Sequence, residues 1–318
     1  MQSSLGDAGL ISIPPRELDA VFGSSEPGLE VESLRPRSFS STVGVWRVRC
    51  TGRTAVLKLI RLGAAPLPRW PSEPDPSSHY YWRREALVYR SGLLDGLDGV
   101  RAPHPLGLFE RDDGSVALWL EDVPESPPWT PERLGAFARR LGRAQAALAR
   151  RLPDEEWLPK GFLRRYLQLH EIRGAECETV LARLDALPHT LAHNDLHPAN
   201  VHGDGAVVLD WAFSGLAPLG LDAGVLVGDG IADDVIRAEQ ADAAGTAVWD
   251  GYSAGLRDAG FEGDVDAIRW GYLRGTALRL SWLDPDRVRE DWMREPWRAA
   301  SALLKRWREV ARGLPSEP

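Results

Sequence analysis

The chain has 318 residues, of which 43% are hydrophobic and 26% are charged, and this composition is ordinary for a globular protein large enough for two lobes. Its net charge of -8 argues against a nucleic-acid partner, because nucleic-acid-binding proteins carry a basic face. No apolar run reaches the roughly 18 residues that span a membrane, and the amino terminus lacks the pattern of a signal peptide. We therefore expect a cytoplasmic protein without a membrane partner.

The first 121 residues are predicted to form a lobe built on a small antiparallel sheet. A short helix is expected over residues 14–22. Apolar runs bounded by turn residues predict five strands, over residues 29–34, 43–50, 54–60, 107–110 and 115–120. Thr51-Gly52-Arg53, between the second and third of these runs, is short enough for a hairpin connection.

Lys58 lies in the middle of the third apolar run. Only three of the 38 basic residues are lysines, so a lysine in this strand is a specific choice and not the ordinary cation of this chain. After a connector rich in proline and serine, residues 80–89 predict a helix that contains Glu85 and is capped by Ser77 or Ser78. Taken alone, Glu85 is typical of a solvated helix carboxylate.

A serine-rich stretch over residues 38–44 separates the first two predicted strands. Hydroxyl groups and backbone amides in such a stretch can bind a phosphate, and Ser41, Thr42 and Gly44 are the candidates. The stretch holds a single glycine, and serine and glycine are also the usual residues of an ordinary turn. Both interpretations stay open at this point.

Residues 122–318 are predicted to form a second, mostly helical lobe. Thr130, Pro131 and Glu132 form a helix start, and apolar residues recur at helical spacing as far as Leu152. Further helical patterns cover residues 162–187, 265–283 and 295–313. A mixed first lobe followed by a helical lobe predicts the α+β class, with a boundary between residues 121 and 122.

Residues 190–222 hold the densest group of polar residues that could act as acids, bases or metal ligands. A short apolar strand leads into a polar loop, and a hairpin follows whose turn is Gly203-Asp204-Gly205 and whose return strand ends at Asp210. Because residues that enter and leave a tight hairpin face each other, Asn200 and Asp210 are expected side by side. Their oxygens suit magnesium, which leaves Asp195 free for proton chemistry.

A zinc site is the alternative interpretation of the same loop. His193 and His197 are four residues apart, as in the helical His-Glu-x-x-His motif. Asn194 stands where that motif has glutamate, and Pro198 argues against a helix. Zinc is therefore disfavoured.

This segment resembles the catalytic and metal-binding loops of the aminoglycoside-phosphotransferase family, whose members are small-molecule kinases with a bilobal protein-kinase-like fold. The family spacing His-x-Asp-x-x-x-x-Asn is met by His193, Asp195 and Asn200. The Asp-Phe-Gly of protein kinases is replaced by Asp210-Trp211-Ala212, a change that is usual in this small-molecule branch. Asp222 matches a further aspartate that in the family braces the catalytic loop.

The resemblance implies a role for each of these residues. It makes Asp195 the catalytic base and Asn200 and Asp210 the ligands of Mg²⁺, and it gives His193 and Asp222 a structural role in supporting the loop.

It also implies a nucleotide site in the first lobe and at the boundary. Lys58, paired with Glu85, is implied to bind the phosphates of ATP or GTP. The backbone around Glu121 and Val123 is implied to contact the nucleobase, and the serine-rich stretch is implied to cover the phosphates.

The acceptor is implied to be a hydroxyl-bearing small molecule. An antibiotic, such as an aminoglycoside or a nucleoside type, and a metabolic sugar, amino sugar or amino alcohol both fit the resemblance. Aromatic residues of the second lobe that could wall an acceptor pocket are Trp270, Tyr272 and Trp282, although core packing is the commoner role of such residues. The acids Asp229, Asp233 and Asp234 are interpreted as a solvated turn rather than a site for a cationic acceptor.

Two other functions are alternatives to a kinase. A nucleotide-binding pseudokinase predicts the loss of a catalytic residue, and all of them are present. A metal-dependent hydrolase would share the carboxylates but would not require Lys58. The expected quaternary state is a monomer or a homodimer, and the two cysteines, Cys50 and Cys177, indicate no disulfide framework.

Overall fold

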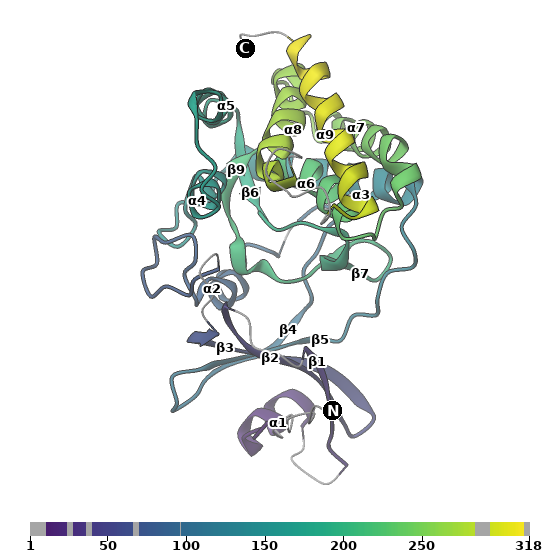
Figure 1. The fold of residues 1–318 in the computed structure, drawn as a ribbon. Helices are drawn as coiled ribbons and strands as arrows, with labels where there is room; N and C mark the ends of the chain where they lie inside the picture. Colours follow the sequence, from purple (N-terminus) through teal and green to yellow (C-terminus); the bar gives the residue numbers. More distant parts are fainter. Residues whose placement is uncertain are drawn as a thin grey trace, which may run out of the picture. The chain divides into compact units, whose positions relative to one another are not determined.

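The computed structural model describes residues 11–23, 28–35, 40–65, 70–95, 97–283 and 293–314. The chain divides into two compact units. The first consists of residues 1–74, 80–90 and 103–122, and the second of residues 75–79, 91–102 and 123–318. Figure 1 shows the helices and strands of both units.

The first unit is built on a five-stranded antiparallel sheet in the order β1-β2-β3-β5-β4. Its strands are β1 (Glu30–Arg35), β2 (Ser40–Cys50), β3 (Arg53–Ala65), β4 (Pro105–Glu110) and β5 (Val116–Glu121), and its helices are α1 (Pro15–Phe22) and α2 (Arg84–Ser91). β2 and β3 join through Thr51 and Gly52, which have φ angles of 51° and 76°. Positive φ at both central residues is the geometry of a tight hairpin turn, and Gly52 adopts it without strain.

The core of the first unit lies between one face of the sheet and α1. Leu57, Trp119 and Phe22 pack in one buried cluster, and the Phe22 and Trp119 rings meet edge to face at 5.9 Å. The indole Nε1 of Trp119 donates to the buried carboxylate of Glu17 at 2.9 Å, and Arg111 pairs with the same carboxylate. Apolar burial and a satisfied buried acid together fix α1 on the sheet.

Two sequence predictions in the first unit are wrong in detail. The serine-rich stretch is strand from Ser40 onward, because its residues pair with β3 through two register shifts; residues 36–39 lie outside the described part of the chain. The predicted helix over residues 80–89 begins only at Arg84. Ser77 does not cap it, since both its backbone amide and its hydroxyl donate to Asp75 in a local turn.

The second unit is mostly helical (Figure 1). Its helices are α3 (Pro131–Ala149), α4 (Phe162–Leu169), α5 (Ala175–Asp185), α6 (Leu221–Ala232), α7 (Ala241–Asp258), α8 (Val265–Arg279) and α9 (Glu295–Arg312), and its short strands are β6 (His189–Ala192), β7 (Val201–His202), β8 (Val207–Val208) and β9 (Gly215–Pro218). The predicted helical region over residues 162–187 is interrupted, because Glu171 and Gly174 have φ angles of 57° and 141° that no helix accommodates. The predicted α+β fold, with a small sheet lobe and a larger helical lobe, is confirmed.

Helices α3 and α7 approach each other closely through glycine. A Cβ atom at Gly251 would collide with the carbonyl oxygen of Gly135, and one at Gly255 would collide with that of Arg139. The same holds for Gly142 against the carbonyl oxygen of Tyr252. This packing fixes the two helices that support the loop described below.

Several further sequence predictions concern side-chain environment. Trp270 and Tyr272 are 7% and 1% exposed and belong to the core, so they do not wall a pocket. Trp282 packs edge to face on Trp297 at 5.5 Å. Within the described residues, no helix is both long and apolar enough to cross a membrane.

Candidate active site

The loop that carries Asp195 begins where β6 ends. β6 pairs with β9 in antiparallel register, with Ala192 opposite Gly215. Asn194 then takes a left-handed conformation with φ 63°, and its side-chain amide donates to the carbonyl of Phe213 at 2.9 Å. Asparagine is among the few residues that adopt this conformation readily, so the sequence itself favours the bend.

Asp222, in the first turn of α6, holds this loop through hydrogen bonds to its backbone. Its Oδ2 accepts hydrogen bonds from the backbone N–H of His193 at 2.8 Å and from Gln145 Nε2 at 2.9 Å, and its Oδ1 accepts from the backbone N–H of Asn194 at 3.0 Å. Burial raises the pKa of the Asp222 carboxyl, and these donors together with nearby His193 oppose that rise. The loop is therefore tied to a fully satisfied buried acid.

The support extends to two residues that the sequence analysis did not identify. Tyr252 donates its hydroxyl proton to Gln145 Oε1 at 2.7 Å and accepts from the backbone N–H of Gly220 at 2.9 Å. Gln145 lies on the apolar face of α3 and is 3% exposed. A lone amide on an otherwise apolar helix face was the signal that could have indicated it.

His193 joins the Asp195 loop to the segment before Asp210. Its Nε2 is 2.8 Å from the carbonyl oxygen of Leu209, and its Nδ1 accepts from the backbone N–H of Asp195 at 3.3 Å. These partners assign the ring proton to Nε2. Both ring nitrogens of His193 therefore serve to hold the backbone of the loop.

Asn200 and Asp210 lie at the open end of the β7–β8 hairpin. The hairpin is shorter than predicted, since β8 contains only Val207 and Val208, but the backbone N–H of Leu209 still donates to the carbonyl of Asn200 at 2.8 Å. Asp210 follows with φ 59°. Asn200 Nδ2 donates to the carbonyl of Asp195 at 3.0 Å, and this bond does not use the amide oxygen.

The donor set at this hairpin fits magnesium. It offers an amide oxygen and a carboxylate, which are hard ligands of the kind that Mg²⁺ takes together with water and substrate phosphates. Among the described residues, no group of three or more His, Cys, Asp or Glu side chains is arranged to hold a metal ion.

Lys58 and Glu85 form a buried ion pair in the first unit. Lys58 Nζ is 2.5 Å from Glu85 Oε2, and the two side chains are 7% and 2% exposed. Lys58 projects from the central strand β3, and Glu85 lies in the first turn of α2. Glu85 is thus not a solvated helix carboxylate, and a lone buried acid would be costly without this partner.

A family model described as the phosphotransferase enzyme family (APH) matches residues 37–259, which include Lys58, Glu85 and the whole loop region. The chain belongs to the phosphotransferase enzyme family. A search of curated proteins found no match.

Solved structures share the fold of this chain at low sequence identity. Amicoumacin kinase hAmiN, solved with AMP-PNP, Ca²⁺ and Ami, is 18% identical, with 90% of this chain and 88% of that chain covered and a TM-score of 0.55. A candidate aminoglycoside phosphotransferase from Ralstonia eutropha JMP134 is 15% identical, with 95% and 98% covered and a TM-score of 0.52. A microcompartment-associated aminopropanol kinase is 14% identical, with 94% and 95% covered and a TM-score of 0.51.

The remaining residues expected at a nucleotide site of this phosphotransferase lie in two places. Glu121 ends β5, and its backbone N–H donates to the carbonyl of His104 at 2.9 Å. The carbonyl oxygen of Val123, the first residue after the unit boundary, is 3.4 Å from His202 Nδ1. If these residues contact a nucleobase, the N–H of Glu121 is not the group that does so.

Ser41, Thr42 and Gly44 lie in a strand and not in the loop that was expected, and their contact with a phosphate stays a prediction. All three lie within β2, and Thr42 is buried at 7% exposure. The Trp46 ring covers Gly44 so closely that a Cβ atom there would overlap it. Packing beneath Trp46 is thus a sufficient reason for this glycine, and the expected loop geometry is corrected to a strand.

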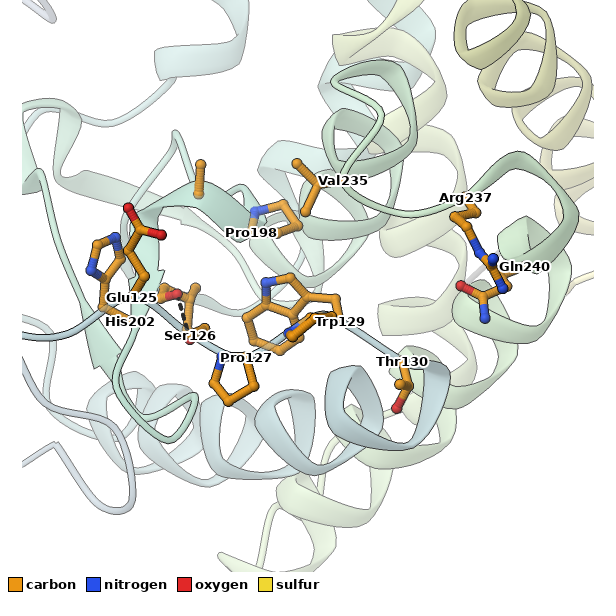
Figure 2. A pocket seen from close by; sticks show the side chains of 13 residues that line it. Glu125, Ser126, Pro127, Trp129, Thr130, Pro198, His202, Val235, Arg237 and Gln240 are labelled. Carbon is orange, nitrogen blue, oxygen red and sulfur yellow. Dashed lines mark hydrogen bonds between the residues drawn. The ribbon is translucent and has the colours of Figure 1, made fainter.

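A pocket of about 860 Å³ opens within the second unit next to the Asp195 loop (Figure 2). Its lining residues are Glu125, Ser126, Pro127, Pro128, Trp129, Thr130, Pro198, Ala199, Val201, His202, Val235, Arg237 and Gln240. Figure 2 shows the apolar side chains in the middle, with Glu125 and His202 on one side and Arg237 and Gln240 on the other. Pro198 and Ala199 come from the loop between Asp195 and Asn200, so this pocket reaches the predicted catalytic segment.

Proposed function

We propose that the protein transfers the γ-phosphoryl group of ATP or GTP to a hydroxyl group of a small molecule. The observation that carries the proposal is the segment from Asp195 to Asp210, in which the partly exposed carboxylate of Asp195 lies in the loop just before a hairpin that carries the amide of Asn200 and the carboxylate of Asp210. Phosphoryl transfer needs positioning and charge neutralisation more than covalent chemistry. This segment positions the reacting groups, and the Mg²⁺ that it would hold supplies the positive charge.

Asp195 acts as the base in the proposed reaction. The acceptor oxygen forms a bond to the γ-phosphorus while the bond from that phosphorus to the leaving nucleoside diphosphate breaks, and the hydroxyl proton passes to the Asp195 carboxylate. Asn200 and Asp210 would hold Mg²⁺, which supplies positive charge to the phosphate oxygens when it is bound. Asp222 and His193 keep the loop in place through the hydrogen bonds described above.

Lys58 binds the phosphates of the nucleotide in this proposal, and Glu85 holds the lysine in position. The buried pair supports this role, because burying two charges costs desolvation free energy, and apolar side chains would serve the fold at least as well. The AMP-PNP of amicoumacin kinase supports a purine nucleotide donor for a protein of this fold.

The acceptor is an antibiotic in our leading proposal. A pocket of about 860 Å³ suits a drug-sized ligand, and Trp129 with its neighbouring prolines offers an apolar wall. Two proteins that share the fold are named for amicoumacin and for aminoglycosides as acceptors. Adding a phosphate of about two negative charges to one hydroxyl can spoil the binding of the antibiotic to its target.

A metabolic kinase is the second proposal. The aminopropanol kinase of similar fold shows that the same architecture serves a much smaller amino alcohol. A nucleotide-binding pseudokinase is less well supported, because Lys58, Asp195, Asn200 and Asp210 are all present.

A phosphorylation screen separates these proposals. Purified protein is incubated with ATP or GTP and Mg²⁺ against a panel of aminoglycosides, other hydroxylated antibiotics, sugars and amino alcohols, and product masses are read directly. Asp195→Asn serves as the matched inactive control. A mass gain of one phosphate with the wild type and none with the variant supports the kinase; nucleotide turnover that ignores the acceptor contradicts it.

Expression in a sensitive bacterium then tests the biological role. Protection by the wild type but not by Asp195→Asn supports an antibiotic acceptor. Absence of protection from every compound, together with fast phosphorylation of a simple sugar or amino alcohol, would leave the metabolic kinase.

A further inference from the structure

Arg279, the last residue of α8, is a buried cation beside the predicted base. The residue is 5% exposed, which is unusual for arginine because burying a charge costs free energy unless other groups compensate. Its guanidinium carbon lies 3.7 Å from the centroid of the Tyr166 ring of α4, and Tyr166 is itself 2% exposed. A planar cation stacked on a buried ring has little freedom to move.

The guanidinium faces the carboxylate of Asp195. Arg279 Nη2 is 3.7 Å from Asp195 Oδ1, so the two groups attract each other at a distance beyond a hydrogen bond. Asp195 remains 25% exposed in its side chain, which leaves part of the carboxylate open to an acceptor. The pair thus combines a fixed cation with an accessible base.

The loop itself does not orient this carboxylate. In the described part of the chain, the hydrogen bonds found at Asp195 use its backbone: the N–H donates to His193 Nδ1, and the carbonyl accepts from Asn200 Nδ2. These bonds place the Cα atom of Asp195 but leave its side-chain rotation undetermined. Orientation of the carboxylate must therefore come from another element.

A second carboxylate, that of Asp229, adds negative charge to the surroundings of Asp195 and Arg279. Asp229 lies within helix α6 and not in the solvated turn that the sequence predicted. Burial raises its pKa, the charge of Arg279 lowers it, and the charge of Asp195 raises it further. Two carboxylates near each other repel, and a guanidinium shared between them offsets that repulsion. Helix α8 thus brings a cation to the side chain of Asp195, helix α4 holds that cation with the Tyr166 ring, and Asp229 of α6 adds a second negative charge that Arg279 offsets.

We propose that Arg279 is a positioning residue for phosphoryl transfer, which holds Asp195 Oδ1 so that the other carboxylate oxygen meets the acceptor hydroxyl. This inference rests on the proposed function. The proton goes from the hydroxyl to Asp195 as the new phosphorus–oxygen bond forms, and Arg279 keeps its own protons throughout. Its contribution is the fixed geometry, since a misplacement of about 1 Å can lower a rate by about 10²-fold.

The test compares Arg279→Gln with the wild type in steady-state kinetics. We expect kcat to fall by about 10- to 100-fold while the KM for nucleotide changes less than about threefold, because Arg279 acts on the base and not on the nucleotide. Arg279→Lys, which keeps the charge, should recover part of kcat. The matched control is Arg183→Gln, which removes a guanidinium stacked 4.0 Å over Trp270 in the same unit.

A double-mutant cycle with Asp195→Asn in single-turnover reactions shows whether Arg279 acts through the base. Once the base is removed, Arg279→Gln should cost little further rate. An unchanged kcat in Arg279→Gln, an equal loss in Arg183→Gln, or full additivity with Asp195→Asn would each overturn the inference. If Arg279→Gln fails to fold, Arg279→Lys enters the same cycle, and additivity there has the same meaning.

The outcome that would contradict the proposed function differs from the outcome that would contradict only the role of Arg279. A wild type that phosphorylates no acceptor, with Asp195→Asn indistinguishable from it, would remove the kinase proposal and this inference with it. An active wild type that Arg279→Gln leaves unimpaired removes the inference alone.

Discussion

At the scale of single residues, Asp222 shows how one buried acid organises a loop. Both of its oxygens accept hydrogen bonds from the backbone of residues 193 and 194, and Gln145 supplies a third donor. The carboxylate is 2% exposed, so no water replaces a partner that is lost. Its effect on chemistry is indirect, because it places the backbone that leads to Asp195.

Asp222→Asn is expected to destabilise the protein by about 2–4 kcal/mol and to lower kcat. The amide keeps one accepting oxygen, but its NH₂ group must face one of the two backbone N–H donors, and each lost hydrogen bond to a buried charge costs about 1.5–3 kcal/mol. The midpoint of urea unfolding measures the stability. Asp234→Asn, at an exposed position of the same unit, is the control and should leave the midpoint unchanged.

Asp195→Asn is expected to lower the rate of phosphoryl transfer by about 10²–10⁴-fold and to leave nucleotide affinity intact, because a positioned base acts on the transition state. Single-turnover rates and calorimetric binding of AMP-PNP measure the two quantities. Retention of most of the rate when chemistry is limiting would remove Asp195 as the base.

Asp229 makes stability depend on pH. Burial raises its pKa to about 6, above the value near 3.9 in an unfolded chain. The folded state therefore holds this proton longer than the unfolded state, and folding stability falls as pH rises from about 4 to about 6. Above this window the carboxylate is ionised in both states and the loss is complete.

Asp229→Asn is expected to remove this fall of folding stability with rising pH. Its melting temperature should match the wild type near pH 4 and exceed it above about pH 7, by an amount equivalent to about 1–3 kcal/mol. Thermal unfolding at four pH values between 4 and 7.5 measures the difference, with Asp234→Asn as control. A difference that stays constant with pH would contradict the assignment.

At the scale of elements, the close approach of α3 and α7 decides where Gln145 and Tyr252 meet. Glycines on both helices allow backbone to pack against backbone, and larger side chains would force the axes apart. The hydrogen bond from Tyr252 to Gln145 and the contact of Gln145 with Asp222 depend on that spacing. The helix pair is therefore part of the support of the Asp195 loop.

Gly251→Ala is expected to destabilise the protein by about 1–3 kcal/mol, although alanine is the better helix former, because its Cβ atom would overlap the Gly135 carbonyl oxygen. Gly313→Ala is the control, since its nearest neighbour would be 3.5 Å away. Denaturant unfolding measures both. Equal effects of the two substitutions would show that the α3–α7 contact tolerates a methyl group.

At the scale of the whole molecule, the residues expected to bind nucleotide are divided between two units. Lys58 and Glu85 belong to the first, and Asn200 and Asp210 to the second. Ligand binding to the folded state raises stability by mass action, by about 2.7 kcal/mol at 100 times Kd. Thermal unfolding with nucleotide therefore reports whether both units take part.

Mg²⁺ with AMP-PNP is expected to raise the melting temperature of the wild type, and Lys58→Ala and Asp210→Ala should each reduce that rise. Lys58→Arg should not restore it, because a forked guanidinium does not replace a point-charge ammonium beside Glu85. Each variant is compared with its own melting temperature without ligand. A full rise in Asp210→Ala, with Mg²⁺ affinity unchanged, would remove Asp210 as a metal ligand.

The sequence by itself determined the features that depend on neighbouring residues along the chain. Alternating apolar runs with turn residues predicted the five strands, and the Thr130 cap predicted the start of α3. The spacing of Asn200 and Asp210 about a glycine turn predicted that they approach each other, because a short hairpin has few geometries. These signals are local, so no knowledge of the rest of the fold was needed.

Only the tertiary structure decided the contacts between distant segments. Gln145, Tyr252 and Arg279 lie 50, 57 and 84 residues from Asp195 along the chain, and no local pattern records their approach to its loop. Strand pairing with β3 likewise overrode the turn preference of Ser41, Thr42 and Gly44. The physical reason is that such contacts depend on how whole elements pack, and packing is a property of many residues at once.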